Sequence, residues 1–431
     1  MGIAATSQAG LNWSRTYAYR APQFRRPASV EELCEVVAAA DRVGVLGSRH
    51  TFNDIADTPG VLVSLDRLPA ELEIDTAAAT ARVSGHLRYG DIAHQLDEAG
   101  FALPSLASLP HISVAGACAT ATHGSSDTSG NLATSVLAMD LVLADGSRVG
   151  VRRGDDDFSG AVVHLGALGV VTSVTLKLVP RYDVAQAVYE DLDWDVAAEN
   201  FDAVTSAAYS VSLFTDLRGP RFNAWLKAKD EHPPHDDLFG AKPAGEARHP
   251  IPGGRTPHAT EQLGVPGPWY ARLPHFRLEF TPSSGEEIQS EYFVPRRAAV
   301  PALAVLRELA PVLAPLVQVC EIRTIAADDL WLSMAYGADS VAMHFTWHDR
   351  PDEVAALLPV LEARLLELGV RPHWGKVFAL TGDHVAAAYP RMSDFRSLAA
   401  RMDPGGVFRN DFLERLVLPL TGTMSTCVRR R

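Results

Sequence analysis

Short apolar runs alternate with segments of helical periodicity over the first 180 residues. Ser29 and Glu32 form a capping box, which predicts a helix over residues 30–42, and a second helix is predicted over residues 89–99. Apolar runs bounded by Gly, Asp or Pro predict strands at residues 43–47, 61–65, 81–84, 136–144 and 170–179. This mixture of helices and strands indicates an α+β domain.

The pattern changes beyond Pro180. Residues 227–267 are rich in Pro, His, Gly and Asp and show no periodicity, so we predict a long surface loop there. Strands and helices follow in a mixed order, which predicts an antiparallel sheet backed by helices. The strands are expected at residues 275–280, 289–293, 319–324, 341–347 and 374–380, and the helices at residues 298–316, 351–368 and 394–401.

Composition narrows the possible functions. The chain has 431 residues, of which 47% are apolar and 21% charged, and its formal net charge is −13. A globular fold is therefore expected, whereas nucleic acid and anionic membranes are poor partners for such a surface. The four cysteines lie far apart without a Cys-x-x-Cys pair, and the N-terminus lacks a cationic start followed by an apolar stretch. These features predict a reducing, cytoplasmic setting without a signal peptide.

Several common catalytic motifs are absent from the sequence. It contains no Gly-x-Gly-x-x-Gly after a strand, no phosphate loop, no His-Glu-x-x-His and no Gly-x-Ser-x-Gly. Nicotinamide, nucleoside triphosphate, zinc-hydrolase and serine-hydrolase chemistry are therefore disfavoured. His232, His235 and Asp237 have the side chains of metal ligands, but no fourth ligand follows at a fixed spacing. We predict a solvated turn there and no metal site.

Three glycine-rich or hydroxyl-rich segments could hold a phosphate-bearing ligand. His50 lies in a turn at the end of a predicted strand, flanked by small and hydroxyl side chains whose donors suit an anion. Residues 110–124 are almost all small or hydroxyl-bearing and include no acid, so backbone amides could approach a pyrophosphate. Glycines near residues 165–172 also allow a ligand to approach the backbone of a predicted strand closely. Each segment alone is more typical of a packed loop, and the hypothesis depends on their combination.

Alternation along the later strands gathers polar side chains on single faces. Glu321 and Arg323 share one face of their strand, while Cys320 and Ile322 point into the core. Such a face is usually solvated. Similar polar pairs on two further strands, with a lysine from the tail, fit a surface that hydrogen-bonds a polyhydroxylated ligand. Those further residues are Gln289, Glu291, His344, Thr346 and Lys376.

The motifs together resemble a known family. Gly-Ser-x-His-x-Phe-Asn at 47–53 is followed by Ala-Ser-Leu-Pro-His-Ile-Ser-Val-Ala-Gly at 107–116, Thr-His-Gly at 122–124 and Gly-Ala-Leu-Gly-Val-Val-Thr at 166–172. In this order they resemble the alditol oxidases of the vanillyl-alcohol-oxidase superfamily of flavoproteins, and the resemblance covers nearly the whole chain. It implies a two-domain α+β fold, with an FAD-binding α+β domain and a substrate domain of antiparallel sheet and helices. The expected bounds are 1–182, 183–371, and a segment 372–431 that returns to the FAD domain.

The resemblance implies FAD attached covalently through His50. Arg49 stands where the family commonly has Gly, and Thr51 replaces a common Ser. Ala107 occupies a position that shapes the approach of oxygen to the flavin in related enzymes. The residues implied to bind FAD are His50, Gly47, Ser48, Arg49, Thr51, Ser108, Ser113, Gly116, Thr120, Ala121, Thr122, His123 and Val171.

The implied reaction converts the terminal primary alcohol of an alditol such as xylitol or sorbitol to an aldose, with O₂ reduced to hydrogen peroxide. Lys376, Arg323 and Glu321 are the implied catalytic residues. An aldonolactone oxidase or dehydrogenase and a non-catalytic carbohydrate-binding protein are the alternatives. The partners expected are a polyol and O₂, and a monomer is compatible with the sequence. The residues implied to contact substrate are Ser108, Glu321, Arg323, His344, Thr346, Lys376 and Gln289.

Overall fold

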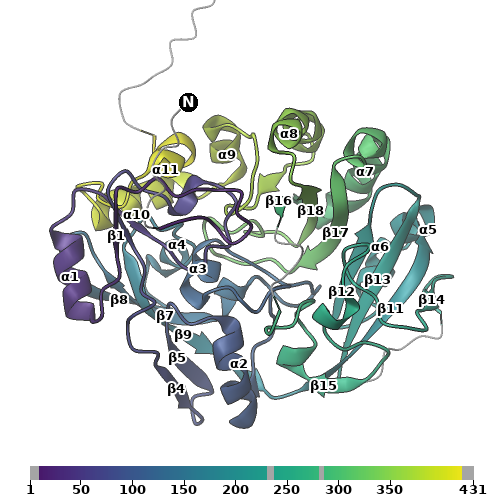
Figure 1. Ribbon diagram of the computed structural model, residues 1–431, viewed down its shortest axis with the longest axis horizontal. Helices are drawn as coiled ribbons and strands as arrows, with labels where there is room; N and C mark the ends of the chain where they lie inside the picture. Colours follow the sequence, from purple (N-terminus) through teal and green to yellow (C-terminus); the bar gives the residue numbers. More distant parts are fainter. Residues whose placement is uncertain (1–8, 231–236, 281–285, 420–431) are drawn as a thin grey trace, which may run out of the picture.

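The structure, a computed structural model, describes residues 9–230, 237–280 and 286–419. In the first 180 residues, a five-stranded antiparallel sheet has the order β4-β5-β9-β7-β8. Its strands are β4 Leu72–Asp75, β5 Thr80–Ser84, β7 Val136–Val142, β8 Arg148–Arg152 and β9 Val170–Lys177. The helices α2 Tyr89–Glu98, α3 Val114–Ala119 and α4 Phe158–Ala161 belong to the same region, on the left of Figure 1.

A small parallel sheet precedes it in the chain. Its order is β1-β3-β2, with β1 Gln23–Arg25, β2 Val43–Val45 and β3 Val61–Val63. Helix α1, Val30–Ala38, connects β1 to β2 and begins at Ser29, whose side chain accepts a hydrogen bond from the Glu32 amide. The loop after β2 carries His50. A two-stranded ribbon of β6 Phe101–Ala102 and β10 Val179–Pro180 completes the region.

The second large sheet is antiparallel and has nine strands. Eight follow the order β14-β11-β13-β12-β17-β18-β16-β19, and β15 also pairs with β11. The strands are β11 Asp183–Asp193, β12 Ser210–Thr215, β13 Arg221–Lys229, β14 Lys242–Pro243, β15 Pro266–Pro268, β16 Glu287–Pro295, β17 Val317–Ile325, β18 Ser340–His348 and β19 Arg371–Pro372.

Helices cover one face of this sheet. Figure 1 shows α7, Ala299–Leu313, and α8, Pro351–Leu366, side by side above β16, β17 and β18. Cys320 and Ile322 are buried in the same core as the apolar residues of these helices, which leaves Glu321 and Arg323 on the opposite face. The short helices α5 Trp194–Glu199 and α6 Phe201–Thr205 lie beside β11 and β12.

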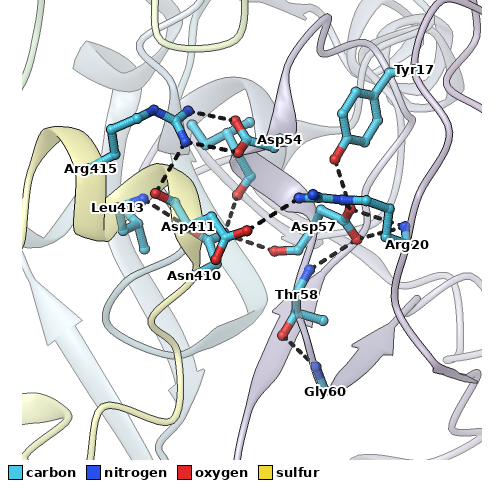
Figure 2. A network of polar contacts seen from close by, with 11 residues as sticks. Tyr17, Arg20, Asp54, Asp57, Thr58, Gly60, Asn410, Asp411, Leu413 and Arg415 are labelled. Atoms are coloured by element: carbon cyan, nitrogen blue, oxygen red, sulfur yellow. Dashed lines mark hydrogen bonds and ion pairs between the residues drawn. The ribbon is translucent and has the colours of Figure 1, made fainter. Parts of the chain in front are cut away.

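The C-terminal segment packs against the first region. It comprises α9 Gly382–Ala388, α10 Met392–Met402 and α11 Asp411–Leu416. Figure 2 shows the polar network that holds α11: Asn410 Nδ2 donates to the carbonyl oxygens of Ile55 and Asp57, both at 2.9 Å, and Arg415 pairs with Asp54 at 3.0 Å. The exact domain bounds stay a prediction.

The predicted fold class is confirmed, with local corrections. The predicted helices and most of the predicted strands form, each within a few residues of its expected bounds. Residues 275–280 and 374–380 are not strands, because individual backbone contacts to other segments replace a continuous ladder. The predicted loop at 227–267 is also wrong at its start, since β13 continues to Lys229 and β14 and β15 interrupt the remainder.

Across the described ranges, none of the helices combines the length and apolar character that a membrane span requires. The described cysteines, Cys34, Cys118 and Cys320, are free thiols. A cytoplasmic location stays a prediction.

Candidate functional site

One large cavity lies between the first region and the open face of the nine-stranded sheet. It is lined from the first region by the loop after β2, helix α3 and the glycines near residue 166, and from the sheet by β16, β17 and β18. His373, Gly375 and Lys376 come from the segment after β19. Side chains remote in the sequence therefore meet at a single site.

His50 lies on the first-region wall of this cavity. Its ring stacks on Trp13, with centroids 5.4 Å apart and planes at 25°, and Nδ1 is buried without a hydrogen-bond partner among the described residues. Burial and the neighbouring His111 ring lower the pKa of the imidazole to about 3. The ring is therefore neutral at physiological pH and keeps a free nitrogen lone pair, as a covalent attachment site requires.

The adjoining wall consists of small and hydroxyl side chains. A Cβ added at Gly47 or Gly116 would lie 2.7 or 2.8 Å from Ser113 Oγ, so glycine at these two positions leaves room for the Ser113 hydroxyl. The carboxylates that line the cavity come from β16 and β17 alone within the described residues. This wall thus suits a dianionic pyrophosphate, and the unpartnered His50 nitrogen fits the attachment of a flavin.

A cluster of buried charges forms the opposite wall; Glu291, Glu321, Arg323 and Lys376 are called the charge cluster below. Glu291 joins its two cations: Lys376 Nζ donates to Oε2 at 2.6 Å, and Arg323 Nη2 donates to Oε1 at 2.5 Å. Arg323 Nε also lies 3.6 Å from Glu321 Oε2. The two cations therefore lie side by side on a carboxylate scaffold at the cavity wall.

The charges in this cluster stabilise one another. Burial alone would raise the pKa of Glu291, but Lys376 and Arg323 hold that pKa well below its ordinary value. In the same way, Arg323 and His275 hold the pKa of Glu321 well below its ordinary value against the effect of burial. Burial lowers the pKa of Lys376, and Glu291 opposes that shift. Both carboxylates are consequently ionised at neutral pH.

Uncharged polar groups complete the sheet side of the cavity. His344 Nδ1 lies 3.7 Å from Glu321 Oε2, and His344 Nε2 is buried without a hydrogen-bond partner among the described residues. Burial and the nearby Lys376 lower the pKa of His344 to about 4, so its ring is neutral. Ser108 Oγ accepts a hydrogen bond from Arg323 Nη1 at 3.3 Å. Gln289 and Thr346, which are paired across β16 and β18, also line the cavity.

The structure brings nearly all the predicted site residues to this cavity. Ala121 is the exception: it is fully buried and is not part of the lining. The Arg49 guanidinium contacts the carbonyl oxygens of Ala9 and Leu11 and lies over the Tyr19 ring, so the side chain anchors the N-terminal segment. FAD contacts by Arg49 and by the other predicted residues stay predictions.

Two site features go beyond the sequence-based interpretation. Lys376 is paired with Glu291 and not with Glu321. The His123 ring lies between the two walls: its Nε2 lies 3.1 Å from Glu291 Oε1 and its Nδ1 lies 2.8 Å from the Gly124 carbonyl oxygen, while its contact with FAD stays a prediction. Strand alternation placed Glu291 on the polar face, yet only the fold shows that it bridges two cations.

His123, Glu291 and His373 could together offer three metal-ligating atoms within 4.8 Å of one another. Both oxygens of Glu291 already accept hydrogen bonds from cations. A divalent ion would have to displace those contacts and approach two positive charges, so we assign Glu291 to the charge cluster and the two histidines to its surroundings. Of the candidate turn, His232 and His235 lie outside the described residues, and Asp237 lies within them.

Comparisons with known proteins agree with this geometry. Residues 21–152 match the family described as FAD binding domain, and residues 284–416 match D-arabinono-1,4-lactone oxidase. The chain is 48% identical to an alditol oxidase from Streptomyces sp., covering 95% of this chain and 99% of that protein. It is 29% identical to an L-gulono-1,4-lactone dehydrogenase from Mycobacterium tuberculosis, over 95% and 99% of the two chains. A crystal structure of cholesterol oxidase from B. sterolicum has the same fold, with a TM-score of 0.77 at 14% identity over 95% and 96% of the chains.

Proposed function

Because the chain belongs to the alditol oxidase family of FAD-dependent flavoproteins, we propose that it oxidises the terminal primary alcohol of alditols such as xylitol and sorbitol to aldoses, with O₂ reduced to hydrogen peroxide. The observation that carries the proposal is the pairing of Lys376 and Arg323 on Glu291, across one cavity from the His50 turn. A polyol bound in this cavity meets two hydrogen-bond-donating cations and several acceptors.

The charge cluster can promote loss of a hydride from an alcohol carbon. FAD, when bound, supplies the two-electron acceptor for that hydride. The alcohol oxygen gains negative character as its proton passes to a base in the cavity, for which the ionised Glu321 and the neutral His344 ring are placed, and an unactivated alcohol has little tendency to reach that state. Lys376 and Arg323 provide fixed positive charges that favour it, while Glu321 and the neutral His344 are placed to bind neighbouring hydroxyls. The cluster is held by its own carboxylates, so it needs little rearrangement during the reaction.

The polyol specificity can be tested directly. We expect xylitol and sorbitol to reduce the bound flavin and to yield peroxide in air, with simple primary alcohols and lactones much poorer substrates. The match of residues 284–416 to D-arabinono-1,4-lactone oxidase makes an aldonolactone the second candidate substrate. Initial peroxide rates across a panel of polyols, lactones and simple alcohols separate the two. A preference for lactones would contradict the alditol proposal.

We further propose that His50 carries FAD covalently. The His50→Ala variant is expected to lose the flavin on acid precipitation, whereas the wild-type pellet stays yellow. His86→Ala is a matched control, because His86 also lines the cavity and its buried Nδ1 also lacks a partner among the described residues. Its pellet is expected to keep the colour. Flavin released from the wild-type protein, or lost only from His86→Ala, would refute the attachment at His50.

Oxygen is the proposed electron acceptor, and Ala107 lines the cavity next to Ser108. We expect enzyme reduced by polyol without oxygen to reoxidise in air-saturated buffer at least as fast as steady-state turnover. Stopped-flow absorbance of the flavin measures that rate. Reoxidation far slower than turnover with an artificial dye would identify the protein as a dehydrogenase. In that case Ala107→Gly, which removes a methyl group from the cavity wall, should accelerate reoxidation.

A further inference from the structure

A buried lysine lies behind the charge cluster. Lys227, on β13, is 1% exposed, although lysine is rarely buried this completely without a counter-charge. Among the described residues, its Nζ contacts two groups. It donates a hydrogen bond to the Leu273 carbonyl oxygen, and it lies 3.4 Å from His275 Nδ1. Neither group is a carboxylate. Full burial of such a cation opposes folding, so we expect this lysine to serve a purpose other than stability.

His275 connects this lysine to the site. Its Nε2 lies 3.0 Å from Glu321 Oε1, on the side of the ring opposite the Lys227 contact. Burial and the neighbouring Lys227 lower the pKa of His275 to about 4, so the ring is neutral. A neutral imidazole that accepts from Lys227 at Nδ1 carries its proton at Nε2, where it donates to Glu321. The edges of the Phe214 and Trp225 rings hold the imidazole in place.

The charge balance of the cluster indicates what the contact between Lys227, His275 and Glu321 contributes. Glu291 and Glu321 offset Arg323 and Lys376, so the cluster itself carries little net positive charge toward a developing alkoxide. Lys227 adds a cation through His275, which contacts Oε1 of Glu321, whereas Arg323 lies near Oε2. Glu287, another buried carboxylate on β16, accepts a hydrogen bond from Gln289.

We propose that Lys227 and His275 are positioning residues for alditol oxidation: they fix the orientation of the Glu321 carboxylate and add positive charge behind it. The inference rests on the proposed function, in which Glu321 binds a substrate hydroxyl. Lys227 and His275 act through Glu321, since its carboxylate is their contact with the charge cluster.

The proposal predicts a specific dependence on pH. Burial lowers the pKa of Lys227 to about 7, so the side chain is charged below pH 7 and neutral above it. The ionisable groups facing it are His275, Glu321 and Arg323, and their pKa values are displaced away from neutrality. We therefore expect flavin reduction by polyol to slow in a step near pH 7 as the Lys227 proton is lost. A step from Lys376 would persist when Lys227 is replaced.

The test compares Lys227→Met with Lys229→Met by anaerobic stopped-flow reduction with xylitol between pH 5.5 and 9.5. Lys229 lies on the same strand over the rings of Tyr182 and Tyr209, away from the cluster. Lys227→Met is expected to keep its flavin, to unfold at or above the wild-type temperature, to be reduced about 10-fold more slowly at pH 6, and to lack the step near pH 7. Lys229→Met is expected to behave as wild type. A Lys227→Met profile within twofold of wild type at every pH would overturn the proposal.

A second variant and a second measurement cover failure of the first variant to fold. His275→Phe keeps an aromatic ring at this position but can neither accept from Lys227 nor donate to Glu321, so we expect it to lose the pH step; a preserved step would overturn the proposal. Nuclear magnetic resonance with ¹⁵N-labelled histidine reports the His275 tautomer without substrate. We expect a proton on Nε2, and a proton on Nδ1 would overturn the relay. If no polyol reduces the wild-type enzyme, the proposed function fails, while the tautomer still tests the contact.

Discussion

Lys376→Met is expected to retain bound flavin but to be reduced by xylitol roughly 100-fold more slowly than wild type, about 3 kcal/mol of lost transition-state stabilisation. Lys376 Nζ is held at 2.6 Å by Glu291 at the cavity wall, so its charge is fixed before substrate binds. Preorganised charge of this kind acts mainly on the developing alkoxide. The reduction rate should therefore fall more than substrate affinity does.

Anaerobic single-turnover reduction isolates this step from oxygen chemistry. The fold should survive the substitution, because Glu291 keeps Arg323 as a counter-charge at 2.5 Å. An unchanged flavin spectrum and unfolding temperature check that point. Lys376→Arg, which preserves the charge with a different shape, should recover part of the rate. A Lys376→Met rate within a few-fold of wild type would remove Lys376 from the mechanism.

The substrate-side strands could be predicted from the sequence because their alternation is regular. On β17, Glu321 and Arg323 face the cavity while Cys320 and Ile322 are buried in the core, as the two-residue period requires. The pairing between strands could not be predicted in this way, because alternation shows which face of a strand a side chain lies on but not which strand is adjacent. That Glu291 lies on both Lys376 and Arg323 depends on β16, β17 and β18 being adjacent, with His344 opposite both Glu291 and Glu321.

The wrong strand predictions fall where the chain enters the site. His275 and Phe276 both donate backbone hydrogen bonds to the Ser108 carbonyl oxygen, and Arg277 donates to the carbonyl oxygen of His258, so isolated contacts to separate segments hold this stretch. Around Lys376, the Asn53 side chain donates to the carbonyl oxygens of Trp374 and Lys376, both at 2.8 Å. Apolar runs in the sequence resemble strands at both places, whereas the contacts that shape them come from remote segments.

Lys227 was missed for a related reason. The composition of residues 227–267 predicts a solvated loop, and a lysine at its border is expected to be exposed. The structure extends β13 through Lys227 and pairs it with Gln186 on β11 and Ser210 on β12. The register places its side chain on the same face of the sheet as Arg323, where the segment around Leu273 and His275 covers it. Burial of this lysine is therefore a property of the fold, which the local sequence does not reveal.

Glu291→Ala is expected to destabilise the fold by about 3–5 kcal/mol, the usual cost of leaving buried charges without their partner. The carboxylate is 1% exposed and accepts from both Lys376 and Arg323, so its removal leaves Lys376 without its carboxylate partner and Arg323 with the longer contact to Glu321 and the hydrogen bond to Ser108. Glu291→Gln keeps one acceptor oxygen and should lose less. Urea unfolding at matched flavin content, followed by tryptophan fluorescence, measures the difference.

Glu362→Ala is the matched control for this prediction. Glu362 is 3% exposed, and its carboxylate accepts from the Tyr292 hydroxyl and the Ala379 amide, both at 2.7 Å. These donors are uncharged, so its loss should cost about 1–3 kcal/mol. If Glu291→Ala cost no more than Glu362→Ala, the two cations would have found other compensation, and Glu291 would not be the scaffold that holds them. A larger loss for Glu291→Ala means that the carboxylate which organises the catalytic cations is also required for the sheet to bury them.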